Sequence, residues 1–423
     1  MEQVVKQRIA DIQRGNVPTG YRKTKCGIIP DTWSCCQPKE IFYGKSIKNN
    51  APELPVLSVT QENGVMLRSE MDKDISYKED SVSSYKRVDI GDFVISLRSF
   101  EGGIEYSQCK GVVSPAYTIF SHSEDVDGSF YKYYFKTDFF INKLNTAVYG
   151  IRDGKQIGFQ DFSNLFIHCP PLEEQRRIAE ILGCCDRVIA LKKELIAEKK
   201  KQKKALMQKL LNPDSGFRLP GFSGEWKSCN LGRFGECIRG VSYQPSEDLR
   251  NNYSSETYTL LRANNFGQSE LNMSEVFFVD KKCVSSEQEI ISGDILISMS
   301  SGSKKAVGKT TLITNIAPKT CVGAFCAIFR SKNSNFLKHF FETRDYQQQL
   351  SLLLEGTNIN NLTPQEIENL KVNIPDNLKE QQAIADILSA ADKEIDLLEQ
   401  ELAQHEQKQK SLMQLLLTGT VRV

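Results

Sequence analysis

The sequence predicts a mixed α/β protein, of the α+β type, in which two tandem globular domains are separated by two long helices. Three observations predict this class. The same helix start occurs twice, as EEQRRIAEIL from Glu173 to Leu182 and as KEQQAIADIL from Lys379 to Leu388. Short β-rich runs precede each copy, and the 423 residues exceed one typical domain. We expect the two helices to pair as an antiparallel coiled coil with pseudo-twofold symmetry.

The repeat covers almost the whole chain. Residues 174–211 align without a gap on residues 380–417, and 16 of the 38 pairs are identical. Upstream, FYKYYFKT matches FLKHFFET, GDFVIS matches GDILIS, and the two tryptophans, Trp33 and Trp226, occupy equivalent positions. Internal similarity of this kind indicates two copies of one unit of about 200 residues. The helices match best and the parts before them diverge, which predicts one architecture with two different specificities.

The repeat also sets the expected boundaries. Each unit is expected to hold a globular domain followed by a long helix, and an amphipathic N-terminal helix is expected to pack near the C-terminal helix. The predicted segments are 1–20 for the N-terminal helix, 21–170 for the first globular domain, 171–212 for the first long helix, 213–375 for the second globular domain and 376–423 for the second long helix.

Within each globular domain, strands are expected before helices. The runs LPVLSV, DFVISL and VVSPAYTIF are rich in β-branched and aromatic residues, and they lie between turns of Gly, Ser and Asn. A helical stretch is expected over about residues 131–148 and its counterpart over about 336–354. A Pro-containing strand or loop, NLFIHCPP or NLKVNIP, then leads into each long helix.

Apolar spacing in the long helices predicts a coiled-coil seam. In the second helix the apolar residues alternate at spacings of four and three, and the first helix follows a looser version of this pattern. The linker NPDSGFRLPGF is short, so the second domain must begin close to the end of the first helix, which favours antiparallel pairing. The expected seam residues are Ile178, Leu182, Ile189, Ile196, Leu206 and Leu210 in the first helix, and Ile384, Leu388, Ile395, Leu398, Leu402, Leu412 and Leu416 in the second.

Composition and motifs exclude several classes of protein. The net charge is +1, and no apolar run approaches the roughly 20 residues that span a bilayer. The charged N-terminus is not typical of a signal peptide. Twelve cysteines are scattered without a CxxC pair and only four histidines are present, which predicts reduced, mostly buried thiols and no zinc site. We therefore expect a cytoplasmic protein with no metal, cofactor or catalytic residue of its own.

One stretch is similar to a phosphate-binding loop. GSKKAVGKT, from Gly302 to Thr310, has five residues between its glycines where the P-loop has four, and the following TLITNIA is typical of a strand. We expect a Gly-containing hairpin loop whose lysines serve a polyanion. A nucleotide-dependent enzyme that uses this loop is the weaker alternative.

Polar loops occur at equivalent places in both copies. Arg and Lys bind guanine edges and phosphates, and Asn and Gln bind adenine edges, although the same residue types also make ordinary turns. The basic run from Lys199 to Lys204 is instead expected to be a solvated helix face. The candidate DNA-binding residues are Gln61, Asn63, Arg98, Ser99, Lys110, Arg152, Lys155 and Gln156 in the first copy, and Arg262, Asn264, Asn265, Ser301, Ser303, Lys304, Lys305, Lys309, Asn358, Asn360 and Asn361 in the second.

Taken together, the chain resembles the specificity subunit of type I restriction–modification systems. The resemblance is carried by PPLEEQRRIAEIL and its repeat LKEQQAIADIL, by LMQKLL, by the C-terminal LLTGTVRV, and by IPDTW with GYRKT before it. It covers essentially the whole chain. The second copy departs from the first, because PDNLKEQ carries two residues where the first copy has the proline before Leu172.

The resemblance implies a function and a set of partners. Such subunits hold two target-recognition domains, each of which reads one half of a bipartite double-stranded DNA target, while the coiled coil sets the unread spacer. The subunit is not catalytic. It binds two methyltransferase subunits, which use S-adenosylmethionine to methylate adenine N6, and a restriction subunit with ATP-dependent translocase and nuclease activity can join. The alternative from a different class is a coiled-coil adaptor whose two globular heads bind protein ligands.

Overall fold

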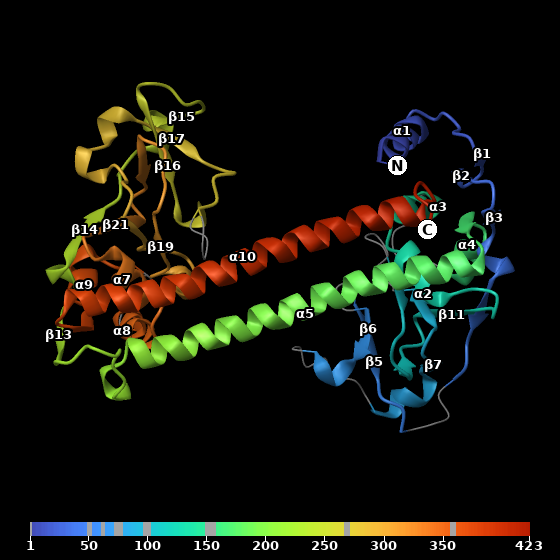
Figure 1. Ribbon diagram of the computed structural model, residues 1–423, viewed down its shortest axis with the longest axis horizontal. Helices are drawn as coiled ribbons and strands as arrows, with labels where there is room; N and C mark the ends of the chain where they lie inside the picture. Colours follow the sequence, from blue (N-terminus) through green and yellow to red (C-terminus); the bar gives the residue numbers. More distant parts are fainter. Residues whose placement is uncertain are drawn as a thin grey trace. The chain divides into compact units, whose positions relative to one another are not determined.

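The structure is a computed structural model of the chain (Figure 1). It describes residues 2–48, 53–60, 64–71, 79–95, 103–148, 158–265, 271–355 and 361–423. The chain divides into two compact units: unit 1 holds Met1–Leu191 with Leu402–Val423, and unit 2 holds Lys192–Glu401. The two long helices, α5 (Leu172–Leu210) and α10 (Leu378–Leu417), belong partly to each unit. The part of a unit outside α5 and α10 is called its head.

The head of unit 1 is built on a four-stranded antiparallel sheet. In spatial order its strands are β4 (Phe42–Lys45), β11 (Thr118–His122), β8 (Phe93–Ile95) and β9 (Ile104–Tyr106). The other strands pair two by two. The remaining elements are α1 (Glu2–Gln13), β1 (Tyr21–Thr24), β2 (Gly27–Pro30), β3 (Ser34–Cys36), β5 (Leu57–Thr60), β6 (Gly64–Leu67), β7 (Lys86–Val88), β10 (Gly111–Val113), α2 (Gly128–Tyr134), α3 (Asp138–Val148), α4 (Phe159–Ser163) and β12 (Ile167–Cys169).

The head of unit 2 repeats this sheet and adds a second one. The repeated sheet is β14 (Gly235–Arg239), β21 (Cys326–Ser331), β18 (Ile295–Ser298) and β19 (Thr310–Leu312), again antiparallel and in the same order as in unit 1. The second sheet is β15 (Leu249–Arg250), β17 (Phe277–Asp280), β16 (Thr257–Leu261) and β20 (Thr320–Val322). The remaining elements are β13 (Trp226–Asn230), α6 (Pro245–Asp248), α7 (Ser334–Phe340), α8 (Arg344–Glu355), α9 (Pro364–Asn369) and β22 (Lys371–Pro375).

A helical stretch follows the sheet in each head, as expected over about 131–148 and about 336–354, and it consists of two short helices. A threonine lies just before the second helix of each pair. The Thr137 hydroxyl donates to the last-turn carbonyl of α2 at 2.8 Å and accepts the third amide of α3 at 3.2 Å. Thr343 makes the same two contacts in unit 2. The side chain thus satisfies the end of one helix and caps the start of the next.

A buried glutamine docks the start of each long helix on its head. The Gln175 side chain accepts the Asp127 amide at 2.9 Å and donates to a carbonyl of the proline pair before α5 at 2.8 Å. Gln381 accepts from the Asn333 side chain at 2.5 Å and donates to the carbonyl of the proline that ends β22 at 2.6 Å. Both glutamines are fully buried. The repeated helix start is therefore a repeated docking contact between helix and head.

Each unit's core is formed by its head together with both long helices. In unit 1 the core is largely aromatic: the Phe42 ring lies edge-on to Phe93, Phe120 and Tyr131 at centroid distances of 5.0 to 5.8 Å. The core of unit 2 holds fewer aromatic rings. The helix residues in the core of unit 1 are Ile178, Ala179, Leu182, Leu416 and Leu417, and those in unit 2 are Met207, Leu210, Ile384, Ala385 and Leu388.

Within each unit the long helices pair antiparallel, as expected (Figure 1). In unit 2, Lys192 pairs with Glu401 at 2.7 Å and Lys199 pairs with Glu394 at 2.5 Å, so the numbers rise along α5 while they fall along α10. In unit 1, the Gln409 side chain donates to Asp186 at 2.6 Å. None of the helices in the described ranges combines the length and the apolar character that crossing a bilayer requires.

The seam of the helix pair differs from the expected one at Leu206. That side chain is 37% exposed, whereas the neighbouring Met207 is buried in the core of unit 2. Residues that alternate at spacings of three and four move slowly around a helix of 3.6 residues per turn. A step of four from Lys203, to Met207 instead of Leu206, corrects this movement and keeps the buried side chains facing the head. The other expected seam residues are buried (Ile178, Leu182, Ile196, Leu210, Ile384, Leu388, Ile395 and Leu416) or half-buried (Ile189, Leu398, Leu402 and Leu412).

The basic run from Lys199 to Lys204 is not simply a solvated helix face. The side chains of Lys199 and Lys203 are only 28% and 14% exposed, and both point across to acidic residues of α10. Lys200 also pairs across the helices, with Glu399 at 2.7 Å. The run was expected to face water because the sequence does not show that α10 supplies carboxylates opposite it.

The expectation of fully reduced cysteines is wrong for one pair. Cys26 and Cys35 form a disulfide, with their Cα atoms 6.0 Å apart. The two cysteines are nine residues apart, in the turn of the β1–β2 hairpin and in β3, and the spacing alone does not reveal that the chain brings them within bonding distance. The other cysteines are free, and several of them are buried.

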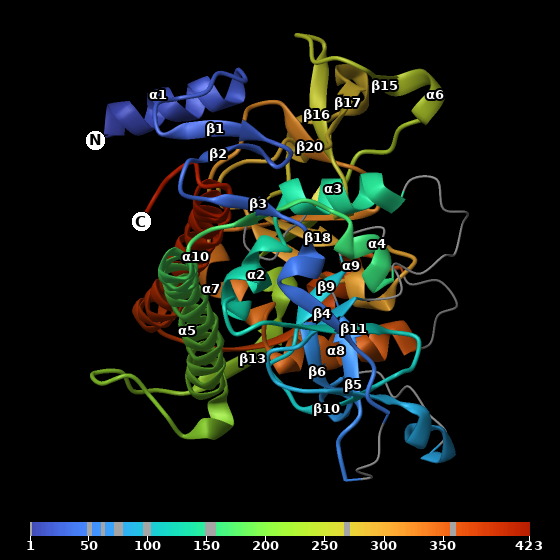
Figure 2. The same ribbon diagram turned by 90° about the vertical axis from the view of Figure 1, so that its right-hand side faces the viewer.

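The N-terminal helix lies against the end of the chain. Figures 1 and 2 show α1 beside the β1–β2 hairpin and near the C-terminus, all within unit 1. The Arg8 guanidinium donates to the Tyr21 hydroxyl at 3.3 Å, and that hydroxyl donates to the Gly419 carbonyl at 2.9 Å. These contacts join the first and last segments of the chain.

Candidate nucleic-acid interface

Four loops of unit 2 meet through backbone hydrogen bonds. The amides of Met299 and Ser300 donate to the Phe325 carbonyl at 2.8 and 3.1 Å. Ser300 also forms an antiparallel bridge with Asn361. The amide of Gly323, two residues before Phe325, donates to the last carbonyl of β16 at 2.9 Å, just before Arg262. The loops at 262–265, 299–304, 323–325 and 361–362 are thus held beside one another, and together they are called the loop cluster.

The loop cluster brings together candidate residues that are far apart in the sequence. Arg262 is half-buried, and its guanidinium lies 3.7 Å from the centroid of the Phe277 ring. This stacking holds the side chain while leaving polar edges for a ligand. Ser301 is half-buried, and the exposed members are Asn264, Ser303, Lys304 and Asn361. The side chain of Lys305 lies outside the described set.

Asn265 has a structural position and is removed from the candidate site. Its side chain is 1% exposed and accepts the Arg262 amide at 2.7 Å. Its amide nitrogen donates to the carbonyls of Asn272 and Glu275 at 2.7 and 2.8 Å. All of these partners are backbone groups, so the side chain holds the turn that follows β16.

Phe325 is a residue of the loop cluster that the sequence analysis missed. Its side chain is 70% exposed, although its backbone carbonyl is fixed by two hydrogen bonds from the neighbouring loop. An exposed aromatic ring on a rigid loop suits contact with bases or sugars. Polar residue types indicate base and phosphate contacts in a sequence, whereas an aromatic residue usually indicates a core position, and the turn VGAF alone does not reveal that Phe325 is exposed.

The stretch from Gly302 to Thr310 is the hairpin loop that we expected and not a phosphate-binding loop. Its last residue begins β19, where a P-loop would begin a helix. The Gly308 carbonyl accepts a hydrogen bond from the buried Tyr346 hydroxyl at 2.8 Å, which anchors the loop on the head. Lys304 and Lys309 are exposed on this hairpin and remain candidates for phosphate contacts.

The candidate residues of unit 1 are mostly outside the described residues. Only Lys110 is described, and it is exposed in the turn before β10. The candidates that lie outside the described ranges are Gln61, Asn63, Arg98, Ser99, Arg152, Lys155 and Gln156 in the first copy, and Asn358 and Asn360 in the second. The interface is therefore built here from unit 2.

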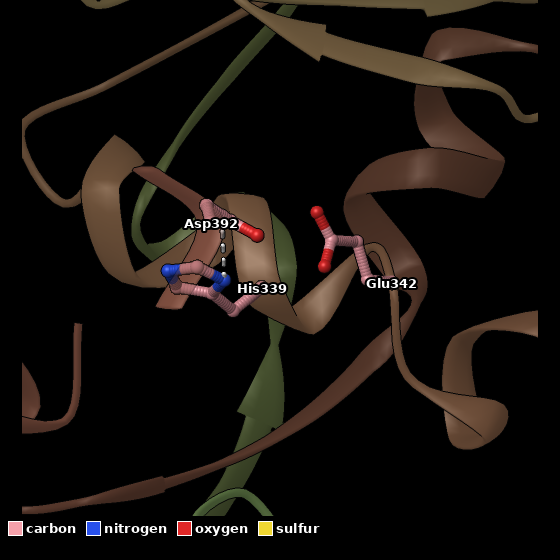
Figure 3. Close-up of side chains that lie close together, drawn as sticks. All are labelled: His339, Glu342 and Asp392. Carbon is pink, nitrogen blue, oxygen red and sulfur yellow. Dashed lines mark ion pairs between the residues drawn. The ribbon is translucent and has the colours of Figure 1, made fainter. Parts of the chain in front are cut away.

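A second cluster in unit 2 has the ligand types of a metal site (Figure 3). Ligand atoms of His339, Glu342 and Asp392 lie within 4.8 Å of one another. However, the Lys203 ammonium contacts both carboxylates, and Lys338 pairs with Asp392 at 2.7 Å. Two cations thus neutralise two carboxylates, and a divalent ion would have to displace both. We assign no metal to these five residues, which are called the Asp392 cluster.

Electrostatics keeps the Asp392 cluster in one protonation state. Burial alone would raise the pKa of Asp392, but hydrogen bonds from Lys203 and Lys338 outweigh it and hold the pKa below its ordinary value. Burial, followed by the nearby Lys338 charge, lowers the pKa of His339 to about 3. His339 is therefore neutral at physiological pH, and its Nε2 lies 3.2 Å from the Ser389 hydroxyl.

Known proteins share this repeat. The family described as "Type I restriction modification DNA specificity domain" matches the chain twice, over residues 36–200 and 223–407. This chain belongs to that family. The two matches correspond to the two copies of the repeat, each with its head and most of its long helix.

Several relatives agree with the family assignment. The chain is 33% identical over 201 residues to the specificity subunit of the StySPI type I restriction enzyme of Salmonella potsdam, covering 46% of this chain and 42% of that subunit. It is 35% identical over 189 residues to the EcoKI specificity subunit of Escherichia coli K12, covering 44% of this chain and 40% of that subunit. The matches therefore span less than half of these two relatives. A putative MjaX specificity subunit of Methanocaldococcus jannaschii is 26% identical over 444 residues, covering 95% of this chain and 97% of that one.

Two solved structures share the fold. One is the S subunit of a type I restriction–modification system from M. genitalium, with a TM-score of 0.57, 16% identity, and coverage of 91% of this chain and 96% of that one. The other comes from a study of complex assembly and conformational transition of a type I system, with a TM-score of 0.54, 18% identity, and coverage of 93% and 99%. The expected combination of two mixed helix–strand units and long helices is thus confirmed.

Proposed function

We propose that this chain is the DNA sequence-specificity subunit of a type I restriction–modification complex. The observation that carries the proposal is the double match to the specificity domain, with one head in each unit. In this proposal each head reads one half of a bipartite target, and the paired helices set the unread spacer. The chain has no catalytic role of its own.

The loop cluster is the proposed reading surface of unit 2. Arg262 and Asn264 supply the donor and acceptor types that recognise guanine and adenine edges in the major groove. Lys304 and Lys309 supply phosphate contacts, which position a protein on DNA but carry no sequence information. Phe325 adds an apolar contact to a base or sugar. Since the net charge is only +1, we expect weak DNA binding by the isolated chain, because phosphate neutralisation supplies much of the affinity of such proteins.

The paired helices are the proposed docking surface for two methyltransferase subunits. Both helices leave apolar side chains uncovered: Leu191 of α5 is 65% exposed, and Leu397 of α10, its repeat equivalent, is 51% exposed. On α5 the exposed Val188, Leu191 and Leu195 follow one another at spacings of three and four, and a contiguous apolar stripe of this kind is typical of a contact with a protein partner. S-adenosylmethionine would be bound by the methyltransferase subunits and ATP by a restriction subunit, and neither by this chain. We place the complex in the cytoplasm.

The proposal is tested by the adenine methylation pattern that the chain directs. A methylation-free host would express it with the methyltransferase encoded beside it, once the two proteins have been shown to copurify. The expected result is a split, asymmetric motif with an unread spacer. A copurifying pair that methylates nothing, or that methylates without a split motif, would contradict the proposal and favour an adaptor that binds protein ligands.

Two matched variants then test the loop cluster. Phe325→Ala is expected to reduce methylation about ten-fold at the target of the wild type, since a lost base contact costs about 1–3 kcal/mol. Leu352→Ala is the control, because Leu352 is also 70% exposed but lies on α8, outside the loop cluster. Equal methylation by the two variants would remove Phe325 from the proposed reading surface.

A further inference from the structure

One aspartate occupies the same position in both copies of the repeat, where a head meets the helix pair. Asp186 of α5 and Asp392 of α10 are equivalent in the gapless alignment. Each receives contacts from a short helix of its own head and from the opposite long helix. The alignment also matches the partners one by one: Lys132 with Lys338, Tyr133 with His339, and Gln409 with Lys203.

In unit 1 the aspartate is held by three donors. The Tyr133 hydroxyl and the Lys132 ammonium, both from α2, lie 2.6 and 3.1 Å from Asp186 Oδ2. The Gln409 side chain, from α10, donates to the other oxygen at 2.6 Å. Burial would raise the pKa of Asp186, but these hydrogen bonds lower it below its ordinary value. A single carboxylate thus joins the head to both long helices.

In unit 2 the same position is held by charges. Lys203 of α5 and Lys338 of α7 pair with the two oxygens of Asp392 at 2.5 and 2.7 Å. Lys203 also reaches Glu342 at the end of the α7–α8 turn, so the opposite helix contacts the head directly. His339 lies beside them, with its Nδ1 4.0 Å from Asp392 Oδ2 and without a hydrogen-bond partner among the described residues (Figure 3).

We propose that Asp186 and Asp392 are positioning residues that fix the orientation of each head on its helix pair, and that this orientation makes the complex strict for one spacer length. Gln175 and Gln381 fix the start of each helix on its head by hydrogen bonds, and apolar contacts, which are less directional, hold the rest. The aspartate lies 11 residues further along each helix, where it adds a second fixed point that stops the head from turning about the first. Charge-assisted hydrogen bonds have a defined geometry. The inference rests on the proposed function, because a spacer exists only if the two heads read two half-sites.

Spacer length is a sensitive measure of head orientation. Each added base pair moves the second half-site by about 3.4 Å along the DNA and by about 35° around it. A head fixed both at the helix start and at the aspartate excludes such a rotation, and a head fixed only at the helix start accepts part of it. A loosened head is therefore expected to relax the spacer while still reading the same bases.

The experiment measures methylation on DNA in which both half-sites are constant and the spacer is one base pair shorter, correct, or one base pair longer. The copurified complex of chain and methyltransferase would carry Asp186→Asn or Asp392→Asn. The discrimination ratio between the correct and the changed spacers is expected to fall about ten-fold in each variant, the effect of losing one hydrogen bond to a charged group. Glu180→Gln and Asp386→Asn are the matched controls, because these residues are repeat equivalents, exposed, and on the same two helices.

Milder variants separate positioning from folding. Gln409→Ala and Lys203→Gln leave the aspartate in place and change only its partner on the opposite helix. Lys203→Gln gives unit 2 a glutamine at this position, as unit 1 has at Gln409. A two- to five-fold fall of the discrimination ratio is expected for Gln409→Ala, which leaves Asp186 with two donors. If the aspartate variants do not fold, this smaller fall still supports the proposal, and an unchanged ratio overturns it.

The outcomes distinguish this inference from the proposed function. A wild type that is strict for one spacer, with relaxed aspartate variants and strict controls, supports the inference. Variants that lose methylation equally on all spacers show a merely structural role and overturn it, as do variants that are as strict as the wild type. A wild type without any split target contradicts the proposed function itself, and this inference with it.

Discussion

In unit 1 the carboxylate of Glu174 accepts hydrogen bonds from Trp33 at 2.9 Å and from Arg422 at 2.5 and 2.7 Å, whereas in unit 2 the equivalent Glu380 pairs with Arg218. Both glutamates lie in the first turn of a long helix and are buried. Arg422 comes from the segment after α10, and Arg218 from the segment after α5. Because the helices are antiparallel within each unit, the end of one lies near the start of the other. Both copies of the repeat thus have a buried glutamate at the helix start, and in each unit its arginine partner comes from the segment that follows the other long helix.

The largest expected effect on stability comes from replacing the arginine that pairs with each of these glutamates. Arg218→Ala leaves Glu380, which is 1% exposed, as a buried and unpaired charge, so we expect a loss of about 3–5 kcal/mol from the free energy of unfolding of unit 2. Arg422→Ala should cost unit 1 about 1–2 kcal/mol, because Glu174 keeps its hydrogen bond from Trp33 and the Arg422 side chain is itself 37% exposed. Urea unfolding of the two variants, followed by hydrogen exchange in each unit, measures both losses.

A double variant provides the control. Arg218→Ala combined with Glu380→Gln removes the unpaired charge and should recover part of the lost stability. Equal losses in the two single variants would show that the Trp33 contact does not compensate in unit 1, and the comparison would then fail.

Two equivalent methionines in the long helices allow a second comparison of the units, with a somewhat smaller expected loss of stability. Met207 is buried in the core of unit 2, whereas its repeat equivalent, Met413, is only half-buried against the core of unit 1. We expect Met207→Ala to lower the free energy of unfolding by about 2–3 kcal/mol and Met413→Ala by about 1 kcal/mol. Leu206→Ala is the control for the changed seam and should cost less than either, since Leu206 is exposed. If Leu206→Ala lowered the free energy of unfolding more than Met207→Ala, Leu206 would be the buried seam residue, as the sequence predicted.

The seam also shows what the sequence alone predicts and what it does not. The repeated helix starts, the sequence of strands before helices in each copy and the antiparallel pairing follow from patterns within single segments. The break at Thr137 depends on one hydroxyl that serves two helices, and the position of Met207 depends on the head that it faces. Phe325 and the aspartate clusters depend on residues brought together from distant segments. Contacts of that kind are set by tertiary packing, which periodicity and composition do not encode.

A pH titration compares the units through His339, where unit 1 has Tyr133. The pKa of His339 is lowered to about 3, so between about pH 6.5 and pH 3 the unfolded chain binds one more proton at this residue than the folded chain does. Stability should therefore fall as the pH falls, by about 1.4 kcal/mol per pH unit for this one group, or about 2 kcal/mol from pH 6.5 to 5. Urea unfolding at several pH values measures the slope.

His339→Gln isolates that contribution. In this variant the free energy of unfolding should lose the part of its pH dependence that comes from His339. It should keep the part that comes from His168, a buried histidine of unit 1 whose pKa is also lowered by burial. The other ionisable groups that lie around His339 are Lys203, Lys338, Glu342 and Asp392. The lowered pKa of Asp392 affects stability only below its ordinary value near 4, outside this range. An unchanged slope in the variant would mean that His339 becomes protonated within the folded protein.

Salt gives the smallest expected effect and distinguishes the two halves of the helix pair. In unit 2 the pairing includes cross-helix ion pairs of Lys192, Lys199 and Lys200 with α10, whereas Asp186 of unit 1 is joined to α10 through the neutral Gln409. Exposed ion pairs contribute about 0.2–1 kcal/mol each and are screened by salt. Raising the salt concentration from about 0.05 to about 0.5 M, which shortens the Debye length to roughly a third, should therefore speed amide exchange along 192–203 of α5 several-fold, equivalent to about 1 kcal/mol. Along 178–189 the change should be smaller, because apolar core contacts and a hydrogen bond from the uncharged Gln409 join this stretch to α10, and salt screens these less than it screens ion pairs. Equal acceleration along both stretches would show that the ion pairs add nothing to helix pairing in unit 2.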